Sequence, residues 1–459
     1  MVAPTALPIV SPTALPAAAP SPTPSAAPSP TVPAGFYRAQ SGDTLAGLVG
    51  RFKVLTDTLL ANNPGLPLTQ TIARGALLNL QYIPGPDEGF ADRLLPDSEV
   101  VYSPGAQQFD IKSFVLSRPG FLATYTETLA DDPAGSPPRA GWEIVDRYAR
   151  SYSIHPRLLL ALLEYQARAL SDPAPGEFTR QYPLGAYSSQ MLPGLSHQLG
   201  WVGNQLNYGY YGWRSGNPPT PFTIGPVPLR VSPTLNAGTF AVLWILGQLY
   251  AKPNFAPDKF GAVYQRLFGD PFAHPVDLLP GGLTQPAFQL PFEPGKTWSF
   301  TSGPHPGYGR TLPFGALDFA PHIEQSGCVT STEWVTAVAP GGIVFSDNGR
   351  MELDLGNGWT VVYLHIATFE RIPAGASVDA GGRLGHPSCE GGNATGTHVH
   401  LSRRYNGEWI PADGFAPFEM SGWVVHGELR PYQGTLSRDG QIVTACPCAN
   451  EATLIQLEP

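Results

Sequence analysis

The chain has 459 residues, of which 14% are charged and 42% hydrophobic, and its formal net charge is −9. Proline and glycine contribute 51 residues each, too many for a coiled coil or a helical repeat array, while 11% aromatic residues are too many for a disordered chain. The length suggests about three domains at roughly 150 residues each. The negative charge argues against nucleic-acid binding, and no apolar run reaches the roughly 18 residues of a membrane-spanning helix.

Residues 1–35 repeat proline, alanine, serine and threonine without a single charge. Such a segment buries too little apolar surface to fold, so we expect a disordered, extended tether. The first residues also lack the basic start and the unbroken apolar stretch of a secretory signal. A signal sequence is therefore not evident in this chain.

From Phe36 to Pro84 the pattern predicts a strand, two short helices and a closing strand. Leu45, Leu48 and Phe52 recur at helical spacing, and an Asn-Asn-Pro-Gly stretch ends the second helix.

This order resembles a LysM module, as do the stretches Ser41-Gly42-Asp43-Thr44-Leu45, Leu60-Ala61-Asn62-Asn63-Pro64 and Gly75 through Pro84. LysM modules bind N-acetylglucosamine-containing glycans in a groove between the first turn and the loop after the second helix. The resemblance implies that the groove consists of seven residues: Gly42, Asp43, Thr44, Leu45, Asn63, Pro64 and Gly65. The alternative is that these residues only cap helices and turn the chain.

Residues 94–280 are predicted to be mainly helical. The segment 149–167 resembles the catalytic-site helices of lytic transglycosylases, which have a lysozyme-like fold, but the position of their acid glutamate holds Gln166. A carboxamide cannot donate the proton that glycosidic cleavage needs, and Glu164 lies about 200° away around the helix. We therefore expect a non-catalytic domain. A nearby aromatic cluster either stacks on sugars or packs in the core: Trp201, Tyr208, Tyr210, Tyr211 and Trp213.

From Leu290 onward, short alternating runs separated by glycine and asparagine predict an antiparallel β domain over 290–446. In Thr397-His398-Val399-His400-Leu401, the alternation of side chains along a strand places both histidines on one face. Two such imidazoles suit Zn2+, whose catalytic sites keep one position for water. The alternative is a pair of surface histidines on an edge strand.

Three segments resemble the lysostaphin-type zinc endopeptidases that cut peptidoglycan cross-bridges, a fold of the duplicated hybrid motif type: Gly315-Ala316-Leu317-Asp318-Phe319-Ala320, Val361-Val362-Tyr363-Leu364-His365 and Thr395-Gly396-Thr397-His398-Val399-His400. Most members have their first histidine where this chain has Phe314, whereas the β-lytic and staphylolytic branch has a Gly-Pro-His loop, here Gly303-Pro304-His305. The resemblance implies that His305, Asp318 and His400 hold Zn2+. His322, four residues beyond Asp318, is the rival.

The same resemblance gives His365 and His398 catalytic roles beside the attacking water, and Tyr432 the role of steadying the oxyanion. The alternative for Tyr432 is a structural role. The four cysteines allow three pairings, and a Cys446-Pro447-Cys448 stretch without a partner motif favours disulfides over a zinc knuckle. By the resemblance, Cys389 lies beside the site and is expected to pair with Cys328.

The sequence thus predicts a multidomain α+β protein with a tether over 1–35, a βααβ LysM module over 36–84, a mainly α lysozyme-like domain over 94–280 and an antiparallel β endopeptidase domain over 290–446. We expect a monomeric, secreted bacterial peptidoglycan hydrolase that acts outside the cell or in its envelope, with Zn2+ as cofactor and the LysM module as targeting device. The alternative is a non-enzymatic peptidoglycan-binding protein or hydrolase activator with a degenerate peptidase domain. All five histidine and aspartate positions of the site are filled, which argues against that alternative.

Overall fold

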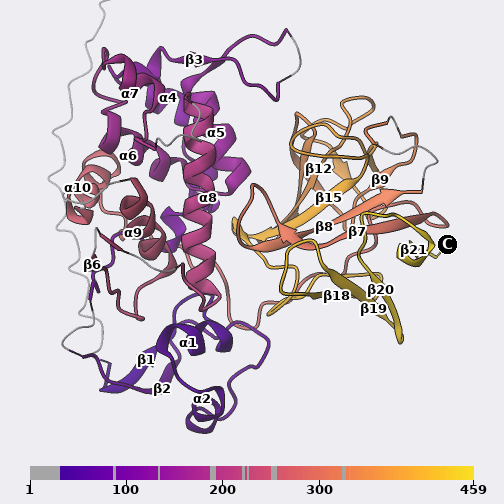
Figure 1. The fold of residues 1–459 in the computed structure, drawn as a ribbon, viewed down its shortest axis with the longest axis horizontal. Coiled ribbons are helices and arrows are strands. Elements are labelled where there is room, and N and C mark those ends of the chain that lie inside the picture. The colour runs from indigo at the N-terminus through magenta and orange to yellow at the C-terminus, as the bar shows by residue number, and fades with distance from the viewer. Residues whose placement is uncertain are drawn as a thin grey trace, which may run out of the picture.

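The structure is a computed structural model that describes residues 32–85, 89–132, 135–186, 193–219, 223–224, 227–249, 256–322, 327–329 and 331–458. Most of the predicted tether lies outside these residues. Helices and strands occupy separate parts of the molecule: in Figure 1 the helices lie on the left, the strands of the C-terminal domain on the right, and a small N-terminal module below the helices.

The N-terminal module has the predicted strand–helix–helix–strand order. Its elements are β1 (Gly35–Arg38), α1 (Leu45–Phe52), α2 (Thr56–Asn62) and β2 (Leu77–Tyr82), and the two strands pair antiparallel. The Thr44 hydroxyl caps α1 by accepting a hydrogen bond from the Gly47 amide at 3.1 Å. A small core around Tyr37, Leu48 and Leu80 holds the four elements together.

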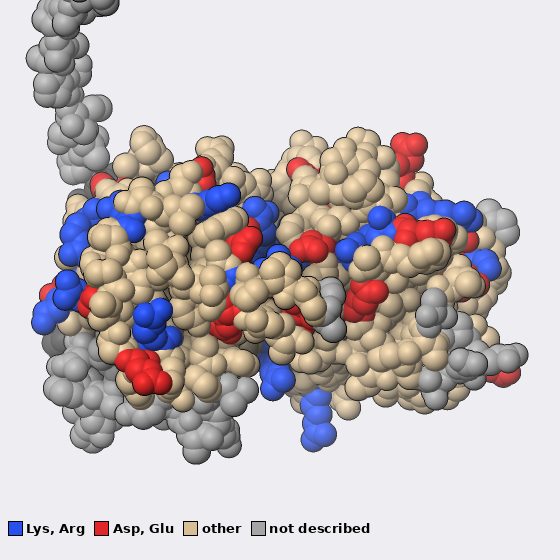
Figure 2. All heavy atoms as spheres, turned by 90° about the horizontal axis from the view of Figure 1, so that it is seen from above, with Lys and Arg blue, Asp and Glu red and all other residues tan. Residues whose placement is uncertain are grey.

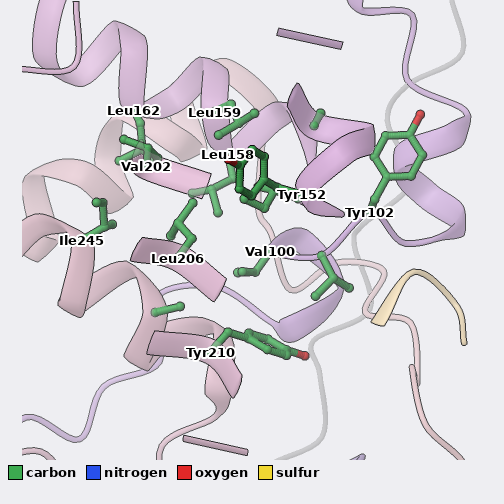
Figure 3. Close-up of a cluster of buried hydrophobic side chains, with 14 of the residues drawn as sticks. Val100, Tyr102, Tyr152, Leu158, Leu159, Leu162, Val202, Leu206, Tyr210 and Ile245 are labelled. Atoms are coloured by element: carbon green, nitrogen blue, oxygen red, sulfur yellow. The ribbon is translucent and has the colours of Figure 1, made fainter. Parts of the chain in front are cut away.

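The middle of the chain is helical, as predicted. Its helices are α3 (Pro104–Gln107), α4 (Ile111–Leu116), α5 (Gly141–Tyr152), α6 (Pro156–Ala167), α7 (Glu177–Gln181), α8 (Leu195–Arg214), α9 (Ala237–Leu249) and α10 (Pro257–Phe268), with 3-10 turns at Asp97–Glu99 and Phe121–Ala123. Two short hairpins add β3 (Thr126–Glu127) with β4 (Arg139–Ala140), and β5 (Thr223–Ile224) with β6 (Val227–Pro228). Helix α6 is buried on every side from Leu158 to Leu163, which makes it the central helix of the core (Figure 3).

The structure defines the roles of Glu164 and of the aromatic cluster in this helical domain. The Glu164 carboxylate is buried and accepts hydrogen bonds from the Leu170 amide at 3.0 Å and the Ser171 hydroxyl at 2.7 Å, so it organises the turn after α6. In the aromatic cluster, Tyr210, Tyr211 and Trp213 are buried. Core packing, and not sugar stacking, is therefore the role of these three rings.

The C-terminal domain contains a nine-stranded sheet in the order β13-β10-β11-β12-β15-β8-β7-β21, with β16 paired to β15. Its strands are β7 (Thr297–Pro306), β8 (Phe314–Pro321), β10 (Gly341–Asp347), β11 (Arg350–Gly356), β12 (Trp359–Leu364), β13 (Ser377–Val378), β15 (Val399–Tyr405), β16 (Glu408–Trp409) and β21 (Leu454–Gln456). All their pairings are antiparallel, as predicted.

Smaller sheets complete the domain. They consist of β9 (Val335–Thr336) with β14 (Arg383–Gly385), and of β17 (Glu419–Met420), β18 (Trp423–Gly427), β19 (Gly434–Arg438) and β20 (Gln441–Thr444), followed by a 3-10 turn at Glu451–Thr453. Among the described residues, no helix is both long enough and apolar enough to span a bilayer.

One hydrophobic cluster spans the helical and β domains, and a second cluster lies within the β domain alone. Trp359, Leu364 and Trp409 of the β domain belong to the same buried cluster as the helices. The Trp409 amide also donates to the Tyr211 hydroxyl at 2.8 Å. Charges are sparse and of mixed sign on the face in Figure 2, in keeping with the low charged content. The shared cluster and the Trp409–Tyr211 hydrogen bond hold α5 and α8 beside the sheet. These helices therefore form part of the surroundings of the site described next.

Candidate metal centre

Three neighbouring strands bring the predicted metal ligands together. Asp318 on β8 lies opposite His400 on β15, and His305 comes from the end of the next strand, β7. The Asp318 Oδ1 atom is 3.2 Å from His305 Nε2 and 3.3 Å from His400 Nδ1, and the two nitrogens are 3.0 Å apart. Ligand atoms about 2.0–2.1 Å from a tetrahedral zinc ion lie roughly 3.3 Å from one another, so this triangle fits the ion.

Hydrogen bonds to carbonyl oxygens orient both ligand histidines. The Nδ1 atom of His305 lies 2.8 Å from the Gly303 carbonyl oxygen, and the Nε2 atom of His400 lies 3.0 Å from that of Gly307. Each ring donates one N–H proton there, so the opposite nitrogen faces Asp318 and can bind a metal ion once it carries no proton of its own. The Asp318 Oδ1 atom is buried and, among the described residues, has no hydrogen-bond donor. A buried oxygen of this kind is what a metal ion would satisfy.

The electrostatics of the triangle suit a cation. Burial opposes the ionisation of Asp318, but His305 and His400 outweigh it and hold the pKa of that carboxyl well below its usual range. Burial lowers the pKa of His400, so this ring is neutral at neutral pH and available as a ligand. For His305 burial acts in the same direction, but the charge of Asp318 together with the hydrogen bonds to Asp318 and Gly303 outweighs it and raises the pKa. A bound cation would replace the proton that this pair otherwise shares.

Two further histidines flank the triangle. His365 follows β12 and His398 precedes β15, with their ring centroids 4.5 Å apart, and His398 Nε2 is 3.8 Å from Asp318 Oδ1. Their Nδ1 atoms lie 3.0 and 2.7 Å from the carbonyl oxygens of Glu390 and Gly396. Both rings therefore present Nε2 as a proton acceptor. Burial, together with His398 and His400, lowers the pKa of His365 to about 3.

The Tyr432 ring stacks on His305, with centroids 4.7 Å apart. Its backbone is fixed by two hydrogen bonds: the Gly303 amide donates to the Tyr432 carbonyl at 3.0 Å, and the Tyr432 amide donates to the Pro304 carbonyl at 2.9 Å. A Cβ atom on Gly303 would lie 2.6 Å from the Gln433 carbonyl carbon. The Gly-Pro-His motif thus needs its glycine because the segment that carries Tyr432 passes directly over it.

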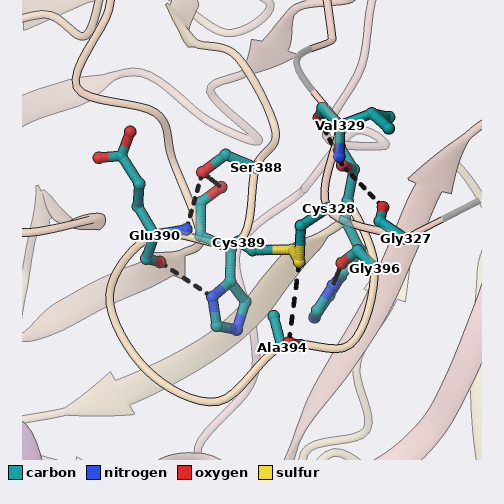
Figure 4. Close-up of a disulfide and its surroundings, with 11 residues drawn as sticks. Gly327, Cys328, Val329, Ser388, Cys389, Glu390, Ala394 and Gly396 are labelled. Atoms are coloured by element: carbon teal, nitrogen blue, oxygen red, sulfur yellow. Dashed lines mark hydrogen bonds between the residues drawn. A yellow bond between two sulfur atoms is a disulfide. The ribbon is translucent and has the colours of Figure 1, made fainter. Parts of the chain in front are cut away.

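A disulfide joins Cys328 to Cys389 with an S–S distance of 2.07 Å, next to Glu390 and close to Ala394 and Gly396 (Figure 4). It ties the segment 389–396, whose Glu390 and Gly396 carbonyl oxygens orient His365 and His398, to the segment 327–329. Cys446 and Cys448 are also bonded to each other, a pairing that the sequence left open. The rival ligand His322 is exposed and lies outside the group of possible ligands.

The centre opens into a cleft of about 930 Å3 between the two large domains. The three ligands, both flanking histidines and Tyr432 line it, and the helical domain supplies the opposite wall with Tyr148, Tyr152 and Asn204 among others. The sequence did not predict this wall. Its residues lie more than 90 positions before His305, and no local pattern signals a contact across that distance.

The seven residues predicted to bind glycan lie away from this cleft, in the N-terminal module. Gly42 and Asp43 are buried, and a Cβ atom on Gly42 would lie 2.7 Å from Arg214 Nη1 of the helical domain. Asp43 forms an ion pair with Arg51, and Leu45 is buried in the module's core. Asn63 bonds to the Asn79 backbone, whereas Pro64 and Gly65 are exposed. Helical-domain residues thus cover the first turn of the predicted groove.

Three protein donors that share a cleft with proton acceptors are the arrangement of a catalytic zinc site, because the metal keeps a further position for water or substrate. The fold and site therefore define a metal-dependent hydrolase.

Comparison with known proteins narrows this class. Residues 93–280 match the family described as LasA, N-terminal domain. The chain is 26% identical to Protease LasA of Pseudomonas aeruginosa over 354 residues, which cover 71% of this chain and 78% of that protein. It is 28% identical to the beta-lytic metalloendopeptidase of Lysobacter enzymogenes over 168 residues, 35% of this chain and 88% of the relative. A solved structure of the M23 metalloprotease pseudoalterin aligns with 24% identity and a TM-score of 0.31, covering 35% of this chain and 96% of that one.

The donor set and these relatives together identify the chain as a zinc-dependent metalloendopeptidase. The region 94–280, which resembles a lysozyme-like domain in its sequence, coincides with the region that matches the family described as LasA, N-terminal domain.

Proposed function

We propose that this enzyme hydrolyses peptide cross-links of bacterial peptidoglycan. The observation that carries the proposal is the triangle of His305, Asp318 and His400, with donor atoms 3.0–3.3 Å apart at the base of a cleft large enough for a polymer segment. The similarity to Protease LasA and to beta-lytic metalloendopeptidases supports a peptidase reaction. Filled ligand positions disfavour the alternative of a degenerate, purely binding protein.

Different residues of the site would bind the metal, transfer the proton and stabilise the oxyanion during amide hydrolysis. Zinc, when bound by the triangle, supplies a Lewis acid that polarises the scissile carbonyl and acidifies water. The free Nε2 atom of His398 or His365 accepts the proton of the attacking water and later returns it to the leaving amine. The Tyr432 hydroxyl donates to the oxyanion as it forms.

The test removes one ligand and measures the metal and the reaction separately. Wild-type protein is expected to carry about one zinc and to release new amino groups from purified peptidoglycan. His400→Ala is expected to lose both, since a zinc site left with two protein ligands holds the metal weakly. The matched control is His426→Ala, which removes an exposed histidine of the same domain outside the cleft. Full zinc stoichiometry in His400→Ala would contradict the ligand assignment.

Mass spectrometry of the released fragments identifies the bond that is cut. We propose that the helical domain is not a glycosidase, because Gln166 stands where lytic transglycosylases have their acid. We also propose that the enzyme works outside the cell or in the envelope. New amino termini without new reducing ends are the expected products. New reducing ends that persist after zinc removal would assign glycosidic cleavage to the helical domain.

The N-terminal module is proposed to be a LysM-type glycan-binding module. Its βααβ order and exposed Pro64 and Gly65 support this role. Because Arg214 covers Gly42, a glycan that used all seven predicted residues would have to displace that arginine. Binding of soluble N-acetylglucosamine oligomers, compared between wild type and Pro64→Ala, tests the proposal.

A further inference from the structure

The cleft also contains an arginine side chain, that of Arg310. Arg310 is the only lysine or arginine among the described residues that line the cleft, and its side chain is exposed. Among the described residues, no carboxylate lies within ion-pairing distance of its guanidinium. The acidic residues of the cleft wall, in contrast, have partners. Glu127 accepts a hydrogen bond from the Tyr125 hydroxyl at 2.8 Å, and Asp131 pairs with Arg147 at 2.6 Å.

The loop that carries Arg310 is fixed between the two domains. The Arg310 amide donates to Asn204 Oδ1 on α8 at 2.8 Å, and the Asn204 side chain in turn donates to the Tyr152 hydroxyl at 3.2 Å. The Tyr308 ring packs edge-on against Tyr152, with centroids 5.0 Å apart. A Cβ atom on Gly309 would lie 2.6 Å from Asn204 Oδ1, so the loop fits only with glycine there. The side chain of Arg310 therefore leaves the backbone from a fixed point.

That fixed point lies in the wall of the same cleft that Tyr152 and Tyr432 line. Tyr152 belongs to the helical wall, and Tyr432 stacks on the ligand His305. A substrate that reaches the metal centre through this cleft thus passes the Arg310 guanidinium, which has no carboxylate partner among the described residues.

We propose that Arg310 is a specificity-determining residue that binds a free carboxylate of the substrate peptide beside the scissile bond. This inference rests on the proposed function for the nature of the substrate. A guanidinium binds a carboxylate through two parallel hydrogen bonds. Lysine cannot form this paired arrangement, and an amide group on the substrate would accept weaker hydrogen bonds than a carboxylate does. The helical domain thereby takes part in substrate selection, because Asn204 fixes the loop.

The experiment compares purified peptidoglycan with the same material after its carboxyl groups have been converted to amides. Wild type is expected to release amino groups from the acidic form about 10- to 100-fold faster at limiting substrate, the usual range for a charge-assisted hydrogen bond. Arg310→Gln is expected to abolish that preference through KM with little change in kcat. Arg310→Lys is expected to retain part of it. The matched control Arg430→Gln removes another exposed arginine near Tyr432 that does not line the cleft, and should behave as wild type.

A second measurement separates this proposal from the proposed function. Equilibrium binding of soluble, uncross-linked stem peptides in acid and amide form needs no cleavage. Preferential binding of the acid form that disappears in Arg310→Gln supports the carboxylate site even if no cross-link is cut. Equal binding of both forms by wild type, or a preference that survives in Arg310→Gln, overturns it.

Discussion

At the scale of single residues, the centre depends on which nitrogen each histidine turns toward the cleft. His305 presents Nε2 and His400 presents Nδ1, because the carbonyl oxygens of Gly303 and Gly307 take the other proton. The alternation of side chains along a strand predicts that His398 and His400 share a face, and both rings do approach Asp318. For His400 the choice of nitrogen lies beyond such a pattern, since it depends on the Gly307 carbonyl in the loop after β7.

Tyr432 offers a test of charge stabilisation at this scale. Tyr432→Phe keeps the ring that stacks on His305 and removes only the hydroxyl. We expect kcat to fall about 100-fold, which is typical for the loss of one oxyanion donor, while zinc content stays at the wild-type level. Steady-state kinetics on peptidoglycan and metal analysis measure the two quantities. Tyr208→Phe, a change at a partly exposed tyrosine outside the cleft, serves as control. Unchanged kcat in Tyr432→Phe would leave this residue with a structural role.

At the scale of elements, helix α6 begins at a buried histidine. The His155 side chain is completely buried, and its Nδ1 atom caps the helix by accepting a hydrogen bond from the Arg157 amide at 3.2 Å. Burial, with a contribution from the charge of Arg157, lowers the pKa of His155 to about 3, although Glu99 Oε2 lies 3.6 Å from His155 Nε2. The folded state therefore holds this ring neutral, whereas in the unfolded chain it titrates near 6.5.

This difference predicts a pH dependence of stability. The stabilisation from neutral His155 is fully present above pH 6.5 and is lost as the pH falls toward 3, because the unfolded chain binds a proton that the folded chain excludes. His155→Asn keeps a capping acceptor and does not titrate. Between pH 7 and pH 4, wild type should lose roughly 3 kcal/mol more unfolding free energy than this variant in urea titrations. Parallel pH profiles of the two proteins would contradict the prediction. His274→Asn, at an exposed histidine, is the control.

Elements with a local signal were predictable from the sequence, and contacts between distant elements were not. The run Trp359–Leu364 is strand β12 to the residue, and the apolar run Leu158–Leu163 lies inside α6. Both follow from periodicity and from the buried environment that it implies. The packing of Tyr308 against Tyr152 depends on the domain arrangement, which no spacing within either segment encodes. The same limit explains why the exposed first turn expected of the N-terminal module is covered by Arg214.

At the scale of the whole molecule, Arg214 links all three folded parts. From the end of α8 its guanidinium donates to the Ser41 carbonyl of the N-terminal module, to Asp97 of the helical domain at 2.9 Å and to Glu408 of the β domain at 3.0 Å. The side chain is largely buried, and burial raises the pKa of Glu408 in spite of its cationic partner. A single charge therefore offsets the desolvation of two carboxylates at the junction of the parts.

Removing this charge should uncouple the parts. Arg214→Ala leaves Glu408 buried without its cation, which typically costs about 3–5 kcal/mol, and it opens the first turn of the N-terminal module. We expect differential scanning calorimetry to show a lower first transition and more separate transitions than in wild type. In contrast, Lys296→Ala breaks a solvent-accessible ion pair with Glu333 and should cost less than about 1 kcal/mol. If Arg214→Ala unfolds at the wild-type temperature in the same transitions, the shared hydrophobic core, and not this arginine, couples the domains.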